Sequence, residues 1–261
     1  MRRRDSIISG KMVYMQIKKN FFTRNGGVSK GEYASLAFMR KKGLGDNFED
    51  YQQNLRIVAA HFGDQRLPVK HLDQNHTNKV VHITAADMIT DEIEADGLVT
   101  TLPNIVLGVI TGDCCPIVFE DNHAKVIGAC HAGWKGAIAG IIENTIAAMV
   151  VLGADKKNIH ATIGPTIGQK SYEVDANFRD QFLDQSPANA SLFIDSVNEG
   201  RYMFDLPGYC ARRLATSGLL NISDVGEDTY SQPEKYFSFR RSTHEKKAIF
   251  GCQMSAVMLA G

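Results

Sequence analysis

The chain has 261 residues, of which 44% are hydrophobic and 22% charged, a composition typical of a folded globular protein. Its 29 Lys and Arg residues equal its 29 Asp and Glu residues, so no net charge attracts a polyanion, and a general nucleic-acid-binding role is disfavoured. The length allows one large or two small domains, and since no repeat or low-complexity linker marks a boundary, we expect one domain.

The amino-terminal segment is basic but contains no apolar stretch of the length of a secretory signal. No run in the chain reaches the roughly 18 apolar residues that cross a bilayer. The five cysteines include neighbours at Cys114 and Cys115 and form no disulfide framework, so we expect reduced thiols. These features predict a cytoplasmic protein with no membrane partner, in which residues 1–15 are a disordered tail and residues 16–261 form the domain.

The first half of the chain predicts one helix followed by several strands. Residues 46–62 place apolar side chains at helical spacing behind an acidic start and end before Gly63. Short runs rich in β-branched residues then have the length of buried strands. These predicted strands are residues 79–83, 105–110, 116–119 and 126–129.

The second half alternates helix and strand. After Gly133 the apolar residues fall on one helical face as far as Gly153, which predicts one long helix that contains Gly136 and Gly140. A strand at 159–163 follows, then helices near 176–184 and 206–216, and the chain ends with an apolar segment at 248–259. The alternation predicts an α/β fold with a mixed β-sheet flanked by helices.

Three segments place metal-capable side chains where a predicted strand stops or turns, and they contain His76, Cys114 and His131. A sheet brings the ends of distant strands together, so these residues can converge. Two imidazoles and a thiolate suit Zn²⁺, and three protein ligands leave a fourth position for water or substrate. The alternative is structural, because Cys is often buried and a His at a strand end is commonly only hydrogen-bonded.

The chain resembles the laccase-domain family, also called the YfiH/YlmD or multicopper polyphenol oxidoreductase family, whose members were later identified as purine nucleoside phosphorylases. The matching motifs run in order through nearly everything after residue 20: FTRNGGVS at 22–29, YASL at 33–36, QNHTNKV at 74–80, GDCCP at 112–116, HAGWKG at 131–136, IGPTIGQKSYEV at 163–174 and YFSFRR at 236–241. The resemblance implies a YfiH-like catalytic domain with His76, Cys114 and His131 as metal ligands. It favours Cys114 over Cys115 because the family's ligand directly follows the Asp.

Two positions depart from the family pattern. The usual Ser-Leu-Asn ends in Ala37 here, which removes an amide that could contact substrate. An Arg common after the HAGW motif is replaced by Lys135, which keeps the charge but not the planar guanidinium fork. A changed substrate preference is therefore expected.

The resemblance implies phosphorolysis of adenosine, inosine and S-methyl-5'-thioadenosine, with adenosine deamination as a further activity and copper-dependent polyphenol oxidation as an older assignment. A multicopper oxidase needs many imidazoles, commonly in His-x-His pairs, and this chain has eight His and no such pair. The His-x-Glu and Pro-Cys-x-x-Cys signature of cytidine deaminases is also absent. Conventional laccase chemistry is therefore disfavoured, and a deaminase would need a different proton shuttle. The resemblance thus implies a phosphorylase with a single zinc, for which copper is the alternative metal.

Candidate catalytic and binding residues surround these motifs. Glu173, in a Tyr-Glu-Val motif, is the candidate acid or base, and a structural carboxylate is the equal alternative. Phosphorolysis needs cationic donors for phosphate, for which the candidates are Arg56, Lys79, Lys135, Arg240 and Arg241. Lys135 ranks first because it lies near the start of the strongest predicted helix. Trp134 can stack on a purine or anchor packing.

Two rival functions use the same residues. In a metal-free Cys/His hydrolase, Cys114 would be the nucleophile and His131 or His76 the base, acting on an amide such as a peptidoglycan precursor. In a non-catalytic protein, structural zinc would take Cys115 or Cys130 as a fourth ligand. The expected partners are purine nucleosides and phosphate, and the expected state is a monomer or a homodimer.

Overall fold

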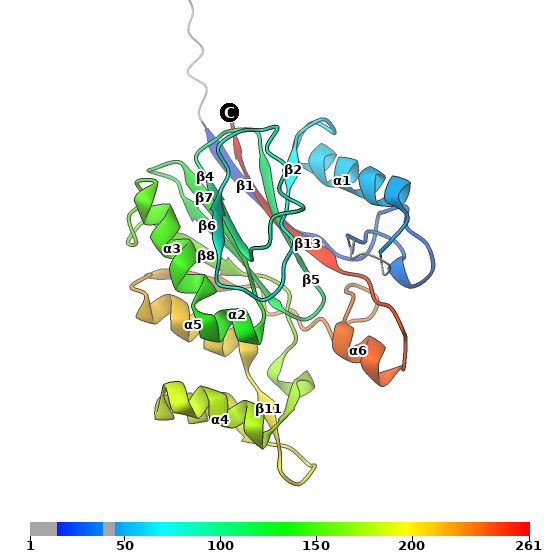
Figure 1. Ribbon diagram of the computed structural model, residues 1–261, viewed down its shortest axis with the longest axis vertical. Helices are drawn as coiled ribbons and strands as arrows, with labels where there is room; N and C mark the ends of the chain where they lie inside the picture. The colour runs from blue at the N-terminus through cyan, green and yellow to red at the C-terminus, as the bar shows by residue number, and fades with distance from the viewer. Residues whose placement is uncertain (1–14, 39–44) are drawn as a thin grey trace, which may run out of the picture.

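The computed structural model describes residues 15–38 and 45–261. The predicted disordered tail, apart from Met15, lies outside this described part. Two β-sheets packed face to face form the centre of the molecule, and helices cover both outer faces (Figure 1). The predicted mixed α/β fold is confirmed, with the difference that the strands form three sheets instead of one.

The larger sheet has six strands in the order β12-β8-β6-β7-β4-β3. Its members are β12 (Asn221–Asp224), β8 (His160–Ile163), β6 (Cys115–Asp121), β7 (Val126–Ala132), β4 (Gly97–Thr100) and β3 (Val80–His82). The two outer pairs are parallel and the inner pairs antiparallel, so the sheet is mixed. The four strands predicted from 79–83, 116–119, 126–129 and 159–163 all lie in this sheet.

The second sheet joins the two ends of the described chain. Its order is β1-β13-β5-β2, made of β1 (Gln16–Phe21), β13 (Gln253–Ala260), β5 (Val106–Thr111) and β2 (Val69–Lys70). Buried Leu107 and Val257 on its inner face pack against Val118 and Ile127 of the six-stranded sheet. The apolar carboxyl-terminal segment is thus a central strand, β13, hydrogen-bonded on both edges.

Helices cover the outer faces. On the six-stranded sheet lie α2 (Trp134–Ala139), α3 (Ile141–Val151) and α5 (Leu206–Thr216), while α1 (Phe48–Phe62) packs through Val58 and Phe62 on the four-stranded sheet. In α1 the Asn47 side chain accepts the backbone N–H groups of Glu49 and Asp50, which explains why the helix begins there. Within residues 15–38 and 45–261, the helices are all too short or too polar to span a bilayer.

A small unit extends from the end of the two-sheet core (Figure 1). It contains a three-stranded sheet of β10 (Phe193–Asp195), β11 (Arg201–Phe204) and β9 (Glu173–Asp175), with α4 (Ala176–Gln185) packed on it. α6 (Phe239–His244) lies to the right of this unit in the view of Figure 1, and its Arg240 donates a hydrogen bond to the backbone carbonyl of Glu173 in β9. Short 3-10 helices complete the described elements: η1 (Gly31–Tyr33), η2 (Gln169–Ser171) and η3 (Pro187–Leu192).

The prediction of one long helix after Gly133 is wrong, because the structure has two helices there, α2 and α3. Gly140 adopts a left-handed conformation with φ of 96°, ends α2 and precedes α3. Glycine has no Cβ to oppose this conformation, so the chain can change direction there while both helices keep their apolar faces on the sheet.

Candidate metal centre and active site

His76, Cys114 and His131 converge at one end of the central strands β6 and β7 of the six-stranded sheet. Their ligand atoms all lie within 4.8 Å of one another, and this is the one group of three metal-capable side chains found in the described part of the chain. Cys114 precedes β6, His131 lies near the end of β7, and His76 lies in the loop before β3. Strands β6 and β7 are antiparallel neighbours, so the end of one lies beside the start of the other.

The backbone at two positions is unusual for residues with side chains. His76 has φ of 60° and Asp113 has φ of 94°, in the left-handed region that residues other than glycine rarely adopt. Such conformations persist only where surrounding contacts impose them. Here they direct His76 and Cys114 toward each other, with Cys114 Sγ 3.5 Å from His76 Nε2.

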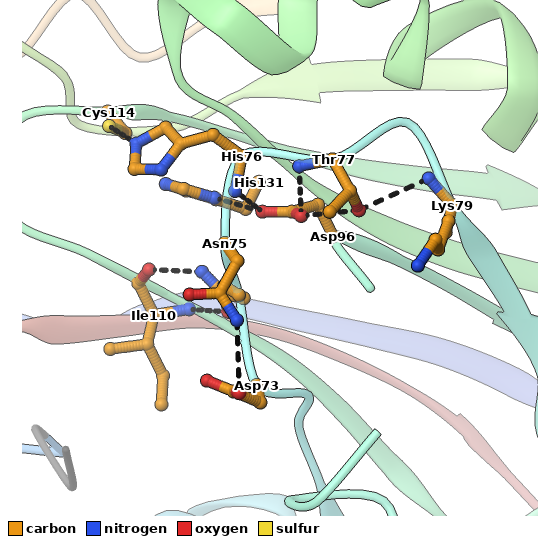
Figure 2. A network of polar contacts seen from close by, with 10 residues as sticks. Asp73, Asn75, His76, Thr77, Lys79, Asp96, Ile110, Cys114 and His131 are labelled. Atoms are coloured by element: carbon orange, nitrogen blue, oxygen red, sulfur yellow. Dashed lines mark hydrogen bonds and ion pairs between the residues drawn. The ribbon is translucent and has the colours of Figure 1, made fainter. Parts of the chain in front are cut away.

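Asp96 links both histidines, as Figure 2 shows. Its Oδ1 accepts His131 Nδ1 at 2.7 Å and the backbone N–H of His76 at 3.0 Å, and its Oδ2 accepts the backbone N–H and hydroxyl of Thr77. Burial alone would raise the pKa of Asp96, but these hydrogen bonds, led by that from His131, lower it. An ionised Asp96 keeps the proton of His131 on Nδ1 and leaves Nε2 as the ligand atom.

The Cys114 thiol is poised as a thiolate. Burial would raise its pKa, but the charge and hydrogen bond of His131, with the contact from His76, lower the pKa to about 6. The pKa of His131 is raised in turn, because Cys114 and Asp96 outweigh the effect of burial. Without a metal the two residues form a thiolate–imidazolium pair.

The local geometry fits a single metal ion. A Cβ atom at Gly133 would lie 2.3 Å from His76 Cδ2 and 2.9 Å from Cys114 Sγ, so only glycine leaves room for the three ligands to meet. The 3.5 Å between Cys114 Sγ and His76 Nε2 is about the distance between two ligands on one tetrahedral zinc. Cys115 and Cys130 are fully buried outside the triad, and burial raises the pKa of both thiols. They do not supply the fourth ligand in this conformation.

The triad opens into a cavity of about 390 Å³, here called the metal cavity. Its walls are mostly apolar and include Ile110, Ile167, Leu206, Phe239, Phe250, Trp134 and Tyr172. Arg240 is the one lysine or arginine among its lining residues in the described part of the chain. An apolar, aromatic cavity with one cation and an open ligand position suits a planar base with an anion beside it.

Asp113 holds Arg240 at this cavity. Its carboxylate is buried and accepts the backbone N–H of Arg240 at 2.6 Å, the hydroxyl of Ser238 at 2.9 Å and the hydroxyl of Thr229 at 2.7 Å. Burial raises the pKa of Asp113 in spite of these bonds. Because Asp113 directly precedes Cys114, the same residue fixes the start of α6 and the backbone of the thiol ligand.

The other predicted residues are dispersed. Glu173 lines a neighbouring polar cavity, and hydrogen bonds from Ser196 and Asn198 lower its pKa. Arg56 lies on α1, beside a separate cavity. Lys79 lies 3.9 Å from Glu94, on the far side of Asp96 from Cys114 (Figure 2).

Two predicted cations and Trp134 lie closer to the site. Lys135 is exposed, with Nζ 5.4 Å from the ring centroid of Trp134, and it lines neither the metal cavity nor the polar one. Arg241 donates to three backbone carbonyl oxygens, which gives it a structural role. Trp134 lines both cavities and also packs on Phe178. Asp96 and Asp113 were not among the predicted site residues. The one sequence feature that could have identified them is the position of an acidic residue next to the end of a strand.

Comparison with known proteins gives consistent matches over most of the chain. A family model described as multi-copper polyphenol oxidoreductase laccase matches residues 18–260. A Rickettsia conorii protein named purine nucleoside phosphorylase is 38% identical over 219 residues, which cover 84% of this chain and 89% of that protein. A Rickettsia prowazekii protein of the same name is 42% identical over 206 residues, covering 79% and 83%. The crystal structure of Bacillus licheniformis YfiH covers 93% of this chain and 92% of its own, with a TM-score of 0.84 and 27% identity.

Proposed function

This chain belongs to the multi-copper polyphenol oxidoreductase laccase family, and from that membership and the metal cavity we propose that it is a zinc-dependent purine nucleoside phosphorylase. Its substrates are adenosine, inosine and S-methyl-5'-thioadenosine with inorganic phosphate, and its products are the free base and the sugar 1-phosphate. The observation that carries the proposal is the open His76, Cys114 and His131 triad facing an aromatic cavity that contains Arg240.

The donor set argues for zinc and against a laccase reaction. Two imidazole nitrogens and a thiolate are ligands that zinc prefers, although copper binds such a set as well. Reduction of dioxygen by a multicopper oxidase requires several coppers and many imidazoles. The described residues offer one group of three ligands. Polyphenol oxidation is therefore not the reaction that these side chains support best.

In phosphorolysis a phosphate oxygen forms a bond with the anomeric carbon, the bond from that carbon to the purine nitrogen breaks, and the purine leaves with the electron pair and a proton. A bound zinc would act as a Lewis acid on an atom at its open position. The apolar walls of the metal cavity exclude water and stack on the base through Phe239, Phe250 or Trp134. Arg240 anchors the phosphate, because a guanidinium fork matches two phosphate oxygens.

Adenosine deamination is a secondary part of the proposal. It would use the same cavity, where the carboxylate among the lining residues is that of Asp113, already bonded to three donors. Glu173 lines the neighbouring polar cavity and is not among the lining residues of the metal cavity. We therefore expect deamination, if measured with adenosine, to be slower than base release.

A second candidate function is supported by one contact set. Cys114, His131 and Asp96 form a Cys-His-Asp chain with a thiolate and an oriented imidazole, the arrangement of cysteine hydrolases. In this alternative the metal-free protein cleaves an amide such as that of a peptidoglycan precursor. The effect of metal on activity distinguishes the two candidates. A bound zinc would occupy the sulfur lone pair of Cys114, which the hydrolase needs for nucleophilic attack.

The proposal also places the protein in the cytoplasm, since Cys114 must stay reduced to act as a ligand. It involves neither nucleic acid nor a membrane, and a monomer or homodimer suffices. The test is ³¹P NMR of adenosine or inosine incubated with zinc-loaded protein and phosphate. Sugar 1-phosphate with free base supports phosphorolysis. Free sugar without phosphate consumption would show hydrolysis and refute the assignment.

A further inference from the structure

A second cavity, here called the polar cavity, adjoins the metal cavity and has a volume of about 570 Å³. The two share Trp134, Tyr172 and Arg240 as common walls. The remaining walls of the polar cavity come from β9, the start of α4 and the β10–β11 hairpin. They carry further charged and polar side chains, namely Glu173, Asp175, Asn198 and Arg201.

Arg240 has free donors at the junction of the two cavities. Its Nη1 donates to the backbone carbonyl of Glu173 at 2.7 Å, and its guanidinium lies 5.2 Å from the ring centroid of Tyr172. Nε and Nη2 have no acceptor within the part of the chain that the structure describes. Arg201, which also lines the polar cavity, makes a long 3.9 Å ion pair with Asp175.

Glu173 supplies an acceptor among these donors. Its Oε1 accepts the hydroxyl of Ser196 at 2.5 Å and the amide of Asn198 at 2.8 Å. Those bonds hold the pKa of Glu173 below its usual range, so the carboxylate is ionised at neutral pH. No donor among residues 15–38 and 45–261 lies within hydrogen-bond distance of Oε2. Two guanidinium groups therefore border the same space as the open carboxylate oxygen of Glu173. The second carboxylate there, that of Asp175, accepts the backbone N–H of Phe178 and lies 3.9 Å from Arg201.

This combination matches inorganic phosphate. At neutral pH phosphate is an anion that still carries at least one P–OH proton, whereas sulfate is an anion without a proton. Guanidinium groups bind the oxygens of both anions, but a carboxylate can accept a hydrogen bond only from phosphate and repels sulfate. A cavity with arginines alone would not distinguish the two.

We propose that the polar cavity is the phosphate-binding site, in which Arg240 and Arg201 hold the anion and Glu173 accepts the P–OH hydrogen bond that excludes sulfate. The assignment rests on the proposed phosphorylase function. The nucleoside then occupies the metal cavity, and the new carbon–oxygen bond forms at the junction lined by Arg240 and Tyr172. Hydrogen phosphate loses one proton on becoming the sugar phosphate, which balances the proton that the departing purine gains.

The experiment measures KM for phosphate and for inosine, with sulfate as a competitor, in zinc-loaded wild type, Arg201→Gln and Glu173→Gln. Arg179→Gln is the matched control, because Arg179 also lies on this small unit but packs on the ring of Tyr202 and lines neither cavity. We expect Arg201→Gln to raise KM for phosphate about tenfold with KM for inosine within about twofold. Glu173→Gln makes sulfate an effective competitor, because the amide can donate to it, and Arg179→Gln changes neither constant.

Calorimetric titration of the same proteins with phosphate separates this inference from the proposed function. If wild type shows no phosphate-dependent turnover but phosphate binds and Arg201→Gln weakens it, the phosphorylase assignment fails and the phosphate site stands. If Arg201→Gln raises KM for inosine instead, the polar cavity holds the nucleoside and the inference is overturned. The inference is also overturned if neither Arg201→Gln nor Glu173→Gln changes KM or Kd for phosphate. It is overturned as well if sulfate binds wild-type protein as tightly as phosphate does.

Discussion

Nδ1 of His131 lies 2.7 Å from Oδ1 of Asp96, and the same carboxylate accepts the backbone N–H of His76. One fully buried acid therefore orients two of the three candidate metal ligands. Carboxylates that bond to ligating histidines set the tautomer and raise the basicity of the metal-bound nitrogen.

Asp96→Asn should weaken zinc binding about ten- to a hundredfold, because the amide no longer fixes the proton of His131 on Nδ1. A competition titration with a zinc chelator measures the affinity. Asp121→Asn is the control: Asp121 is also fully buried and accepts three backbone N–H groups, but it is not part of the triad. Equal loss of zinc affinity in both variants would refute a specific role for Asp96.

Metal-free protein should be alkylated at Cys114 by iodoacetamide at a rate that rises as pH passes about 6 and levels off above it, since the thiolate is the reacting form. The sign follows from a pKa lowered from 9.0, which populates the thiolate at neutral pH. Mass spectrometry of the labelled peptides provides the readout, with buried Cys115 and Cys130 as internal controls of low reactivity. Half-maximal labelling near pH 9 would contradict the thiolate–imidazolium pair.

Gly133→Ala should lose bound zinc and turnover while the protein remains folded, because the new methyl group would lie 2.3 Å from His76 Cδ2 and push the ligands apart. Metal analysis and thermal unfolding of the same sample separate the two effects. Gly200→Ala is the control, since its Cβ meets nothing within 4 Å but its φ of 71° disfavours alanine. We expect that control to lose about 1 kcal/mol of stability and to keep its zinc. Full zinc occupancy in Gly133→Ala would show that the site is not shaped as described.

Arg240→Lys should raise KM for phosphate about tenfold, because an ammonium group keeps the charge but loses the fork that contacts two oxygens. For the same substitution at the neighbouring Arg241 we expect a different outcome. Its guanidinium donates to the carbonyl oxygens of Thr229, Tyr230 and Tyr236, so Arg241→Lys should lower the melting temperature and change KM for phosphate little. Steady-state kinetics and thermal unfolding test both variants. An unchanged phosphate KM in Arg240→Lys would remove it as the anchor.

The sequence predicted the elements better than their assembly. Periodicity located α1, α4 and α5 within a few residues, since apolar spacing and capping are local properties. The break at Gly140 was missed because the apolar pattern continues through it, and a glycine in a helix does not reveal its φ. Strand β9 and the β10–β11 hairpin were also missed, because strands of three or four residues carry too little pattern.

The candidate site, like the fold, was only partly predictable from the sequence. The positions of His76, Cys114 and His131 at strand ends made their convergence predictable once a sheet was expected. Which cations reach the cavity depends on the path of long loops, so Arg240 lines it while Arg56 and Lys79 do not. The role of Asp96 depends on the pairing of β4 with β7, which places it beside His131 and which no local pattern reveals.

Zinc content and phosphate-dependent release of hypoxanthine from inosine can be measured on the same preparations of wild type, Cys114→Ala and Cys115→Ala. If the metal centre performs phosphorolysis, wild type and Cys115→Ala hold about one zinc per chain and turn over, and folded Cys114→Ala loses both the zinc and the turnover. Cys114→Ala protein that still releases base in a phosphate-dependent reaction would contradict the claim that this metal centre performs the phosphorolysis.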